Sequence, residues 1–314
     1  MRDILSVGEM VIDFLPGSEP GSYLRKAGGA PANVAIAAAR AGLDAGFCGR
    51  MGDDDFGRFL MKTLRENGVG ICVPELTDKA ITTMAFVTLD ASGERSFTFA
   101  RKPGADMFLT CEDVDRAGVE ESVIVHAGSC SLSMPPASEA TEYALRKAHE
   151  LGRLVSFDVN YRNLMWNDDI GAAAEAVRGI LPYVDLLKIS DEEADMIGGE
   201  EAVPDIMKKY GITVLIETLG GDGARWFFDG RSGLLPSIPS ECVDTCGAGD
   251  AFWGNFLTGL IRGGVRSVSD INESVIEDAI RRGNIAGALC VRKKGAIESL
   301  PTAAEIEEFM RHEC

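Results

Sequence analysis

Short apolar runs alternate with longer segments of helical periodicity along most of the chain. Most runs are rich in Val, Ile and Leu, which is typical of strands buried on both faces of a sheet. Helical segments between such strands make them run parallel and cover both faces. The alternation therefore predicts a mostly parallel, Rossmann-type three-layer α/β fold. The strands are expected at 4–7, 47–50, 123–126, 154–158, 186–189 and 213–217, and the helices at 32–41, 56–67, 137–150, 171–180, 191–197, 203–210, 249–262, 274–291 and 303–311.

One region breaks this alternation. Residues 82–89 and 95–100 are rich in Thr and Phe and are separated by a short run that contains Gly. This pattern predicts two antiparallel strands joined by a turn. A small sheet inserted into an α/β domain at about 11–25 and 82–105 is either a lid over a ligand site or an ordinary edge hairpin. We expect a single domain over residues 1–314 with this lid sheet inserted.

The charge balance restricts the partners of the protein. Its 314 residues include 49 acidic and 31 basic side chains, which gives a formal net charge of −18. A polyanion would be repelled, so we expect neither a nucleic acid nor an anionic membrane surface as a partner. No apolar run approaches the length of a membrane span, and an acidic residue stands at Asp3, so we expect neither a transmembrane helix nor a secretory signal.

The eight cysteines are scattered, none belongs to a C-x-x-C pair, and the chain has three histidines. A zinc site is therefore not expected. Scattered thiols in a chain of this size indicate a reducing compartment, so we expect a cytoplasmic protein.

A run of small residues precedes the helix expected at 249–262. Gly247, Ala248 and Gly249 have little or no side chain, so their backbone N–H groups can approach a ligand. The positive end of the helix dipole points to the same place, which suits a phosphate. Asp250 would repel a phosphate that is merely held, but it suits a site where a carboxylate accepts the proton of an attacking hydroxyl. The alternative is a helix start after a glycine turn, with Asp250 as its cap.

Two distant segments carry a family signature. Residues 27–35, Ala-Gly-Gly-Ala-Pro-Ala-Asn-Val-Ala, and residues 244–250, Asp-Thr-Cys-Gly-Ala-Gly-Asp, resemble the two motifs of the ribokinase-like sugar kinases, the PfkB family. Residues 86–107, 158–166 and 187–193 resemble the corresponding segments of the fructokinases in that family. The resemblance implies a ribokinase-like fold with a β-sheet lid.

The resemblance also implies transfer of the γ-phosphoryl group of ATP to a sugar hydroxyl, with Mg²⁺ as a cofactor. Asp250 would be the base. The backbone N–H groups of Gly247, Ala248 and Gly249, together with that of Cys246, would form the anion hole. The sequence has neither a Walker A motif nor a protein-kinase glycine loop, so the phosphate site must be of this third type.

The sugar site that the resemblance implies contains Asp13, Gly28, Gly29 and Asn33. Asp13 accepts hydrogen bonds from hydroxyl groups, and Asn33 can both donate and accept. The two glycines let the backbone approach the sugar ring. The alternatives are a turn at the glycines and a polar helix start at Asn33.

Four further side chains are candidates for contacts with the substrate. Phe97 and Phe99 alternate with polar residues, so both rings lie on one face of their strand and either cover the sugar or pack the lid. Arg162 is a candidate for the sugar or for the γ-phosphate, or is an exposed cation. Arg101 or Arg162 could also bind a substrate carboxylate through two hydrogen bonds.

The resemblance places the nucleotide at the carboxyl edge of the sheet, where the glycines that follow a strand bind ligands. Glu193 would orient Mg²⁺ through water, because Mg²⁺ keeps much of its hydration shell. The alternative for Glu193 is a solvated helix acid. Asn284 would contact the edge of the adenine. The implied nucleotide-binding residues are Lys188, Glu193, Thr218, Gly220, Gly223, Gly249 and Asn284.

Many relatives use a monovalent cation beside the anion hole, and the resemblance implies a K⁺ site here. Cys246 stands where a Thr is usual, but a carbonyl ligand tolerates a change of side chain. The matching ligands are the side chains of Asp244 and Ser299 and the carbonyl groups of Cys246, Cys290, Lys293 and Gly295.

The expected reaction is the conversion of fructose to fructose 6-phosphate by ATP. Alternative acceptors are 2-keto-3-deoxygluconate, a nucleoside or another pentose, because lids are where sugar kinases diverge in specificity. A noncatalytic sugar sensor on the same fold is a hypothesis of a different class, but a sensor would not need Asp250. A homodimer through the lid sheet is a further hypothesis.

Overall fold

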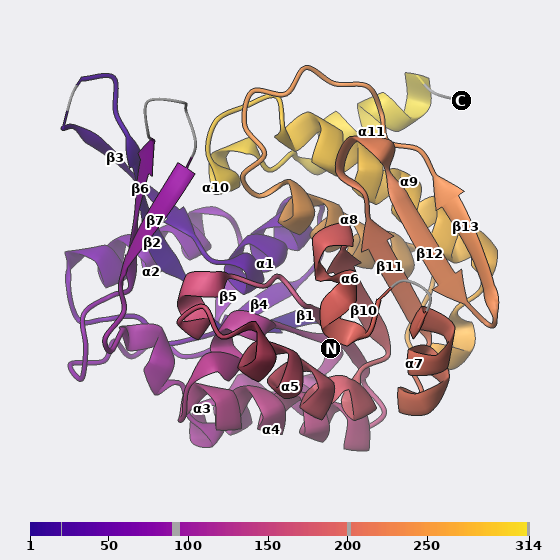
Figure 1. Ribbon diagram of the computed structural model, residues 1–314, viewed down its shortest axis with the longest axis horizontal. Helices are drawn as coiled ribbons and strands as arrows, with labels where there is room; N and C mark the ends of the chain where they lie inside the picture. The colour runs from indigo at the N-terminus through magenta and orange to yellow at the C-terminus, as the bar shows by residue number, and fades with distance from the viewer. Residues whose placement is uncertain (20, 90–94, 200–201, 313–314) are drawn as a thin grey trace.

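The computed structural model of the protein describes residues 1–19, 21–89, 95–199 and 202–312 (Figure 1). Its centre is a nine-stranded sheet. In spatial order the strands are β13 (Arg231–Leu235), β12 (Ala224–Phe228), β11 (Val214–Thr218), β10 (Leu186–Ser190), β9 (Leu154–Asp158), β8 (Ser122–Gly128), β1 (Arg2–Val7), β4 (Ala45–Cys48) and β5 (Gly70–Ile71). The strands from β11 to β5 run parallel, whereas β12 and β13 form an antiparallel hairpin on β11. This arrangement confirms the predicted mostly parallel sheet.

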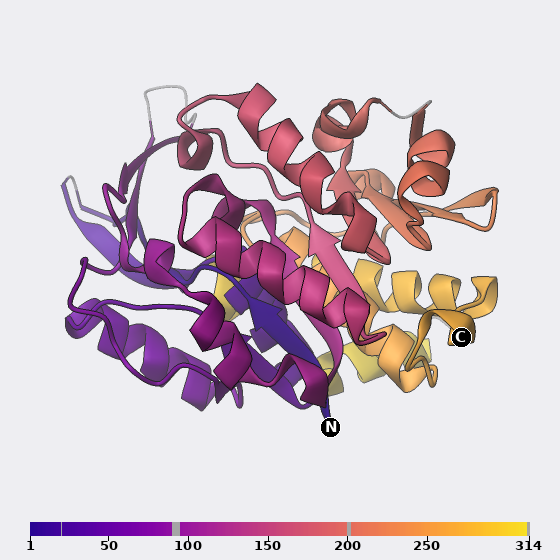
Figure 2. The same cartoon turned by 90° about the horizontal axis from the view of Figure 1, so that it is seen from below.

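Helices cover both faces of this sheet because both faces are apolar. On β9, Val155 and Phe157 pack into one apolar cluster, and Leu154 packs into another on the opposite face. The first face is covered by α3 (Cys111–Ala117), α4 (Ala137–Glu150) and α5 (Ile170–Ile180), and the second by α1 (Ala30–Arg40), α8 (Ala248–Arg262) and α9 (Glu273–Cys290) (Figure 2). The other α-helices of the described residues are α2 (Asp55–Glu66), α6 (Ala194–Ile197), α7 (Val203–Tyr210), α10 (Ala296–Ser299) and α11 (Ala303–His312). None of the described helices is long and apolar enough to cross a membrane.

A second, smaller sheet projects from one edge of the molecule (Figure 1). Its strands in order are β3 (Tyr23–Gly28), β2 (Val11–Pro16), β6 (Met84–Leu89) and β7 (Arg95–Ala100). Strands β6 and β7 are antiparallel, as the sequence predicts, and β2 pairs with β3 antiparallel and with β6 parallel. Phe14 stacks on Phe86 with 4.9 Å between the ring centroids, which joins β2 to β6. The small sheet is thus a layer separate from the central sheet.

The structure differs from the predicted elements in a few places. Residues 191–197 begin with a 3₁₀ turn, Asp191–Glu193, and only then continue as the short α6. The sequence pattern also does not predict α3 or the β12–β13 hairpin. Helix α3 has seven residues, and the hairpin strands contain Arg225 and Gly233, so none of them forms a long apolar run.

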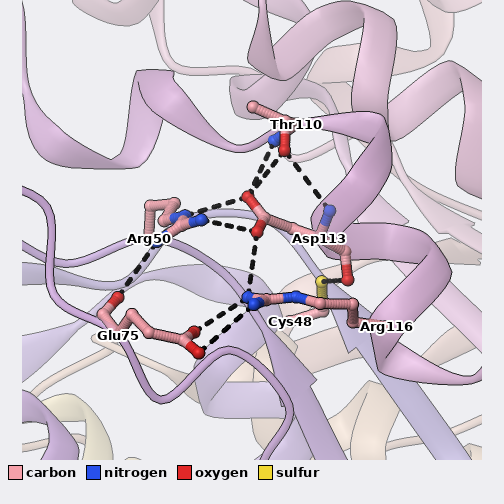
Figure 3. A network of polar contacts seen from close by, with 6 residues as sticks. All are labelled: Cys48, Arg50, Glu75, Thr110, Asp113 and Arg116. Carbon is pink, nitrogen blue, oxygen red and sulfur yellow. Dashed lines mark hydrogen bonds and ion pairs between the residues drawn. The ribbon is translucent and has the colours of Figure 1, made fainter.

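A buried carboxylate ties α3 to the segment that follows β4 (Figure 3). The side chain of Asp113 is 2% exposed and accepts hydrogen bonds from Arg50, from Nε at 2.9 Å and from Nη2 at 2.6 Å. It also accepts from the backbone N–H and the hydroxyl of Thr110, the residue that caps α3. Arg116 lies 3.3 Å from the same carboxylate and pairs with the exposed Glu75. Burial raises the pKa of Asp113, but the hydrogen bonds from Arg50 and Thr110 outweigh it and lower that pKa.

We expect Asp113→Asn to lower the free energy of unfolding by about 3 kcal/mol, because Arg50 then stays mostly buried without its charge partner. Glu75→Gln removes only an exposed ion pair, so its cost is about 0.5 kcal/mol. Urea denaturation at pH 7 measures both. The folded-state pKa of Asp113 is lowered, so its stabilisation is present above the unfolded-state pKa and is lost as the pH falls through the folded-state pKa. Equal costs for the two variants would show that Asp113 is not the central contact.

Candidate active site

The central candidate residues meet at the carboxyl edge of the central sheet. Asp158 ends β9, and Lys188 lies on the neighbouring β10. Asn33 lies in the first turn of α1, and Gly249 and Asp250 lie in the first turn of α8. Contacts among these five residues place the first turns of both helices against the ends of β9 and β10. This edge is where parallel sheets bind ligands.

The N-terminus of α8 provides unpaired backbone donors. Its N-cap is Gly247, which has a left-handed conformation with φ of 78°, and no side chain caps the helix. A Cβ at position 247 would lie 2.9 Å from Cα of Ala296, so only glycine fits. In the described part of the chain, the N–H groups of Gly249 and Asp250 donate to no protein acceptor. The N–H group of Cys246 donates to Asp244 and that of Ala248 to the carbonyl group of Thr245 at 3.2 Å, so these two predicted members of the anion hole are engaged by the protein itself. The alternative expectation, in which Asp250 caps the helix, is therefore wrong, because the helix begins at Ala248.

The Asp250 carboxylate lies beside α1. Its Oδ2 accepts a hydrogen bond from Nδ2 of Asn33 at 2.8 Å. Desolvation by the surrounding protein raises the pKa of Asp250 to about 6. The hydrogen bond from Asn33 opposes this rise, and the nearby charge of Asp158 adds to it. A carboxylate with this pKa is ionised at neutral pH and is a stronger base than an ordinary aspartate.

A buried ion pair stands next to the unpaired amides. Nζ of Lys188 lies 2.9 Å from both carboxylate oxygens of Asp158, and the two side chains are 7% and 2% exposed. A Cβ at Gly249 would lie 3.6 Å from the same Nζ. Burial alone would lower the pKa of Lys188, but the charges of Asp158 and Glu193 raise it, so the ammonium stays charged. Asp158 is absent from the predicted site, although an acidic residue at the end of a buried strand is a signal that could have found it.

Asp13, Gly28 and Gly29 form a tight corner at the base of the small sheet. A Cβ at Gly28 would lie 2.1 Å from Oδ2 of Asp13. A Cβ at Gly29, whose φ is 108°, would lie 2.6 Å from the carbonyl oxygen of Glu9. Position 29 therefore requires glycine, and a side chain at position 28 would displace the Asp13 carboxylate. Desolvation raises the pKa of Asp13 to about 7, and the charge of Arg162 opposes that rise.

Two buried polar atoms of the site have no partner among the described residues. They are Oδ1 of Asn33, whose Nδ2 is bonded to Asp250, and Oε2 of Glu9. Desolvation raises the pKa of Glu9 to about 7, and the charge of Asp106 adds to the rise. Unpaired buried polar atoms are costly, so both atoms are candidates for a contact with a ligand or water. Glu9 is not among the predicted residues, and its position just after a buried strand is again the available signal.

The four remaining substrate candidates have different surroundings. The side chain of Phe97 lies outside the described part of the structure. Phe99 and Arg101 line a cavity of about 410 Å³. The Arg101 side chain is 6% exposed and is paired with Asp106, with 2.9 Å between Nε and Oδ2. Arg162 is exposed, and its positive charge offsets part of the rise in the pKa values of Asp13 and Asp250.

Glu193 connects two loops at the ends of β9 and β10. It is buried, and its carboxylate accepts hydrogen bonds from the backbone N–H groups of Tyr161 at 2.6 Å and Ser190 at 2.9 Å. The alternative expectation of a solvated helix acid is therefore wrong. Each carboxylate oxygen keeps a further lone pair with which to hold a water molecule.

The other nucleotide candidates lie near the end of β11. The hydroxyl of Thr218 donates to a carbonyl group of β10 at 3.3 Å, and Gly220 begins the turn that follows. A Cβ at Gly223 would lie 2.1 Å from a carbonyl oxygen of β13, so this glycine is needed for the fold itself. Asn284 on α9 donates its Nδ2 to two carbonyl groups at the end of β13, at 3.3 Å and 3.0 Å. Its amide nitrogen is thus engaged by the backbone.

The residues predicted to bind K⁺ lie together beside the anion hole. Asp244 is buried and accepts hydrogen bonds from the backbone N–H groups of Cys246 and Gly295, each at 3.0 Å. Sγ of Cys290 lies 2.9 Å from Oγ of Ser299 and 3.7 Å from the carbonyl oxygen of Cys246. Within the described ranges, no group of three or more His, Cys, Asp or Glu side chains is placed to hold a metal ion. The residues predicted to bind K⁺, which these contacts bring together, are Asp244, Cys246, Cys290, Lys293, Gly295 and Ser299.

Comparisons with known proteins agree with this geometry. A family model described as the pfkB family carbohydrate kinase matches residues 1–303. The chain is 39% identical to fructokinase-1 of Zea mays over 317 residues, which cover 98% of this chain and 97% of that protein. The similarity therefore extends over almost the full length of both proteins.

Solved structures give the same result. The crystal structure of fructokinase with bound ATP from Xylella fastidiosa has a TM-score of 0.90 and 32% identity, and the match covers 99% of this chain and 98% of that one. A fructokinase double mutant from Vibrio cholerae O395, solved in a fructose, ADP and potassium ion bound form, has a TM-score of 0.87 and 32% identity, with 98% of each chain covered. The chain belongs to the pfkB family of carbohydrate kinases.

Proposed function

We propose that the protein is an ATP-dependent fructokinase, which transfers the γ-phosphoryl group of ATP to fructose and forms fructose 6-phosphate. The observation that carries this proposal is the meeting of the Asp250 carboxylate with the unpaired amides of α8. A base beside free backbone donors suits phosphoryl transfer to a hydroxyl group. Similarity to fructokinases over almost the whole chain supports fructose as the acceptor.

In the proposed reaction, Asp250 accepts the proton of the attacking hydroxyl as the new O–P bond forms. Asn33 holds the carboxylate in place through its hydrogen bond. The amides of Gly249 and Asp250 bind the oxygens of the moving phosphoryl group, and Lys188, paired with Asp158, holds its ammonium group beside them. Phosphoryl transfer depends mainly on the position of the reactants and on the stabilisation of charge. These are the two contributions that the named groups make.

The sugar would lie in the corner formed by Asp13, Gly28 and Gly29. Asp13 accepts hydrogen bonds from its hydroxyl groups, and the unpaired Oδ1 of Asn33 accepts another. The small sheet acts as a lid that covers the ring. Arg101 is already paired with Asp106, so this arginine is not free to bind the carboxylate of 2-keto-3-deoxygluconate.

Two cations fit the residues of the site. Mg²⁺ would be held by the phosphates and by water on Glu193, whose oxygens have lone pairs to spare. It would neutralise charge on the phosphates. K⁺ would be held by the carboxylate of Asp244, the hydroxyl of Ser299 and neighbouring carbonyl groups, all of which are oxygen donors. A cation there would lie beside the anion hole.

A panel of acceptors tests the proposal. Fructose, 2-keto-3-deoxygluconate, ribose and a purine nucleoside are each incubated with MgATP, and ADP release is measured. Fructose-dependent ADP release, with fructose 6-phosphate as the product, supports the proposal. Faster ADP release with another acceptor would show that the protein is a kinase but that fructose is not its preferred substrate. Sugar binding without ADP release would favour the noncatalytic sensor.

We expect K⁺ to raise kcat in the presence of saturating MgATP and fructose, because a cation beside the anion hole adds positive charge near the moving phosphoryl group. The measurement compares KCl with tetramethylammonium chloride at the same ionic strength. Ser299→Ala removes one proposed ligand without touching the phosphate site and should weaken the K⁺ response. Equal rates with the two salts would contradict the K⁺ site.

The edge of the small sheet is a candidate surface for a homodimer. Strand β3 lies at that edge, and Tyr23 and Leu24 on it are 44% and 55% exposed. An open strand edge with exposed apolar side chains can pair with a second copy. Light scattering of the protein and of Leu24→Lys would distinguish a dimer through this edge from a monomer.

A further inference from the structure

A row of buried polar side chains crosses the face of the central sheet beneath α1 and α8. Ser6, His126 and Ser156 are register partners on β1, β8 and β9, so they lie side by side. Each is 1% exposed or less. Neighbouring residues on the same face, such as Ile124 and Leu154, belong to the apolar core. Polar groups at such positions need partners, and the two serines at the ends of the row find theirs on the helices.

Both ends of the row hold a helix that carries site residues. Oγ of Ser6 donates to the carbonyl group of Pro31, in the first turn of α1, at 2.6 Å. At the other end, Nε1 of Trp253 on α8 donates to Oγ of Ser156 at 2.9 Å. The Trp253 side chain is fully buried. Through these hydrogen bonds, the row holds α1 and α8 against the central sheet close to Asn33 and Asp250.

The middle of the row sets the direction of these hydrogen bonds. The Trp253 indole can only donate, so Ser156 accepts from it and has its own proton left to donate. Nδ1 of His126 lies 3.0 Å from Oγ of Ser156 and can accept that proton when the ring is neutral. Burial, together with the charge of Lys188, lowers the pKa of His126 to about 3, so the ring is neutral at physiological pH.

The geometry points to Trp253 as a positioning residue for Asp250. Trp253 follows Asp250 by three residues, or nearly one helical turn, so the hydrogen bond to Ser156 fixes the rotation and height of the turn that carries the carboxylate. On its other side, α8 lies so close to α1 that a Cβ at Gly254 would come within 2.9 Å of the carbonyl oxygen of Val34. The second turn of α8, which directly follows the turn that carries Asp250, is thus in contact with both the central sheet and α1.

The same strand also positions the charge beside the anion hole. Ser156 and Asp158 are two residues apart on β9, so they lie on the same face. Ser156 holds α8 through Trp253, and Asp158 holds Lys188 beside Gly249. A small rotation of α8 would move its free amides relative to that fixed ammonium. Such a displacement lowers the rate of phosphoryl transfer although every group of the site is still present.

Trp253→Phe tests this role, because phenylalanine fills most of the space but has no N–H group. We expect kcat to fall about tenfold, with the KM values for fructose and MgATP within about twofold of wild type. Trp226→Phe is a matched control. Trp226 is also buried in the same apolar cluster, but its Nε1 has no partner among the described residues. It loses a similar ring volume but no hydrogen bond, so it should lose less stability than Trp253→Phe and keep its kcat.

Ser156→Ala is the second variant, in case the ring substitution alone disturbs the core. It should lower kcat in the same way, and the double variant should lose no more than the worse single one, since both remove the same hydrogen bond. Unchanged kcat in both Trp253→Phe and Ser156→Ala would overturn the inference. Equal losses of kcat in Trp253→Phe and Trp226→Phe would overturn it too. The inference rests on Asp250 as the base, which Asp250→Asn tests separately: a failed Trp253 test with an inactive Asp250→Asn leaves the proposed function standing.

Discussion

Asp250→Asn is expected to lower kcat about 10³-fold while the protein remains folded and able to bind fructose. Asn has nearly the shape of Asp, and its side-chain oxygen can still accept the hydrogen bond that Asn33 now donates at 2.8 Å. The amide cannot accept the proton of the attacking hydroxyl, so only the chemical step suffers. ADP release at saturating substrates measures kcat, and thermal unfolding checks the fold. A variant within tenfold of wild type would mean that another group is the base.

The pH profile provides the control for this variant. The pKa of Asp250 is raised to about 6, and the base is active only when deprotonated. Wild-type kcat should therefore fall at acid pH as Asp250 becomes protonated in the enzyme–substrate complex, about tenfold for each further pH unit, and be level at higher pH. Asp13 titrates near pH 7, but at saturating fructose its titration affects KM rather than kcat. The residual activity of Asp250→Asn should lack the acidic limb.

The fold could be predicted from the sequence where local pattern and tertiary environment agree. Strand β9 is buried on both faces, so every residue from Leu154 to Phe157 suits a strand core except Ser156. The β12–β13 hairpin is the opposite case, because it lies at the sheet edge: β12 alternates buried with half-buried side chains at its start, and β13 is mostly exposed. Its strands carry no run that distinguishes them from a loop. The pairing of these strands depends on the contact of β12 with β11, which the local sequence of the hairpin does not indicate.

The candidate site could be predicted as a set of residues but not as a set of contacts. Asn33 and Asp250 are 217 residues apart, and only the packing of α1 against α8 brings them to 2.8 Å. Their two motifs indicate the residues, while the hydrogen bond depends on the whole fold between them. Arg101 shows the converse, because its pairing with Asp106 changes what a basic residue in the lid segment can bind. Side-chain pairing of this kind has no signature in one sequence.

Gly249→Ala is expected to lower kcat about 10²-fold and to leave the protein as stable as wild type or more stable. Position 249 is an exposed helical residue, and an added Cβ would meet only the end of Lys188, at an ordinary contact distance of 3.6 Å. Alanine favours a helix over glycine by about 1 kcal/mol. Packing therefore does not require glycine here. The methyl group would instead occupy the space through which a phosphoryl oxygen reaches the free amides.

Gly247→Ala, two residues away, separates folding from function. Position 247 has a left-handed φ of 78°, and a Cβ there would lie 2.9 Å from Cα of Ala296. We expect this variant to lower the free energy of unfolding by more than about 1 kcal/mol, because alanine is strained in that conformation. Urea denaturation and ADP release are measured on both variants. A stable and fully active Gly249→Ala would mean that the phosphoryl group does not bind against the α8 amide at position 249.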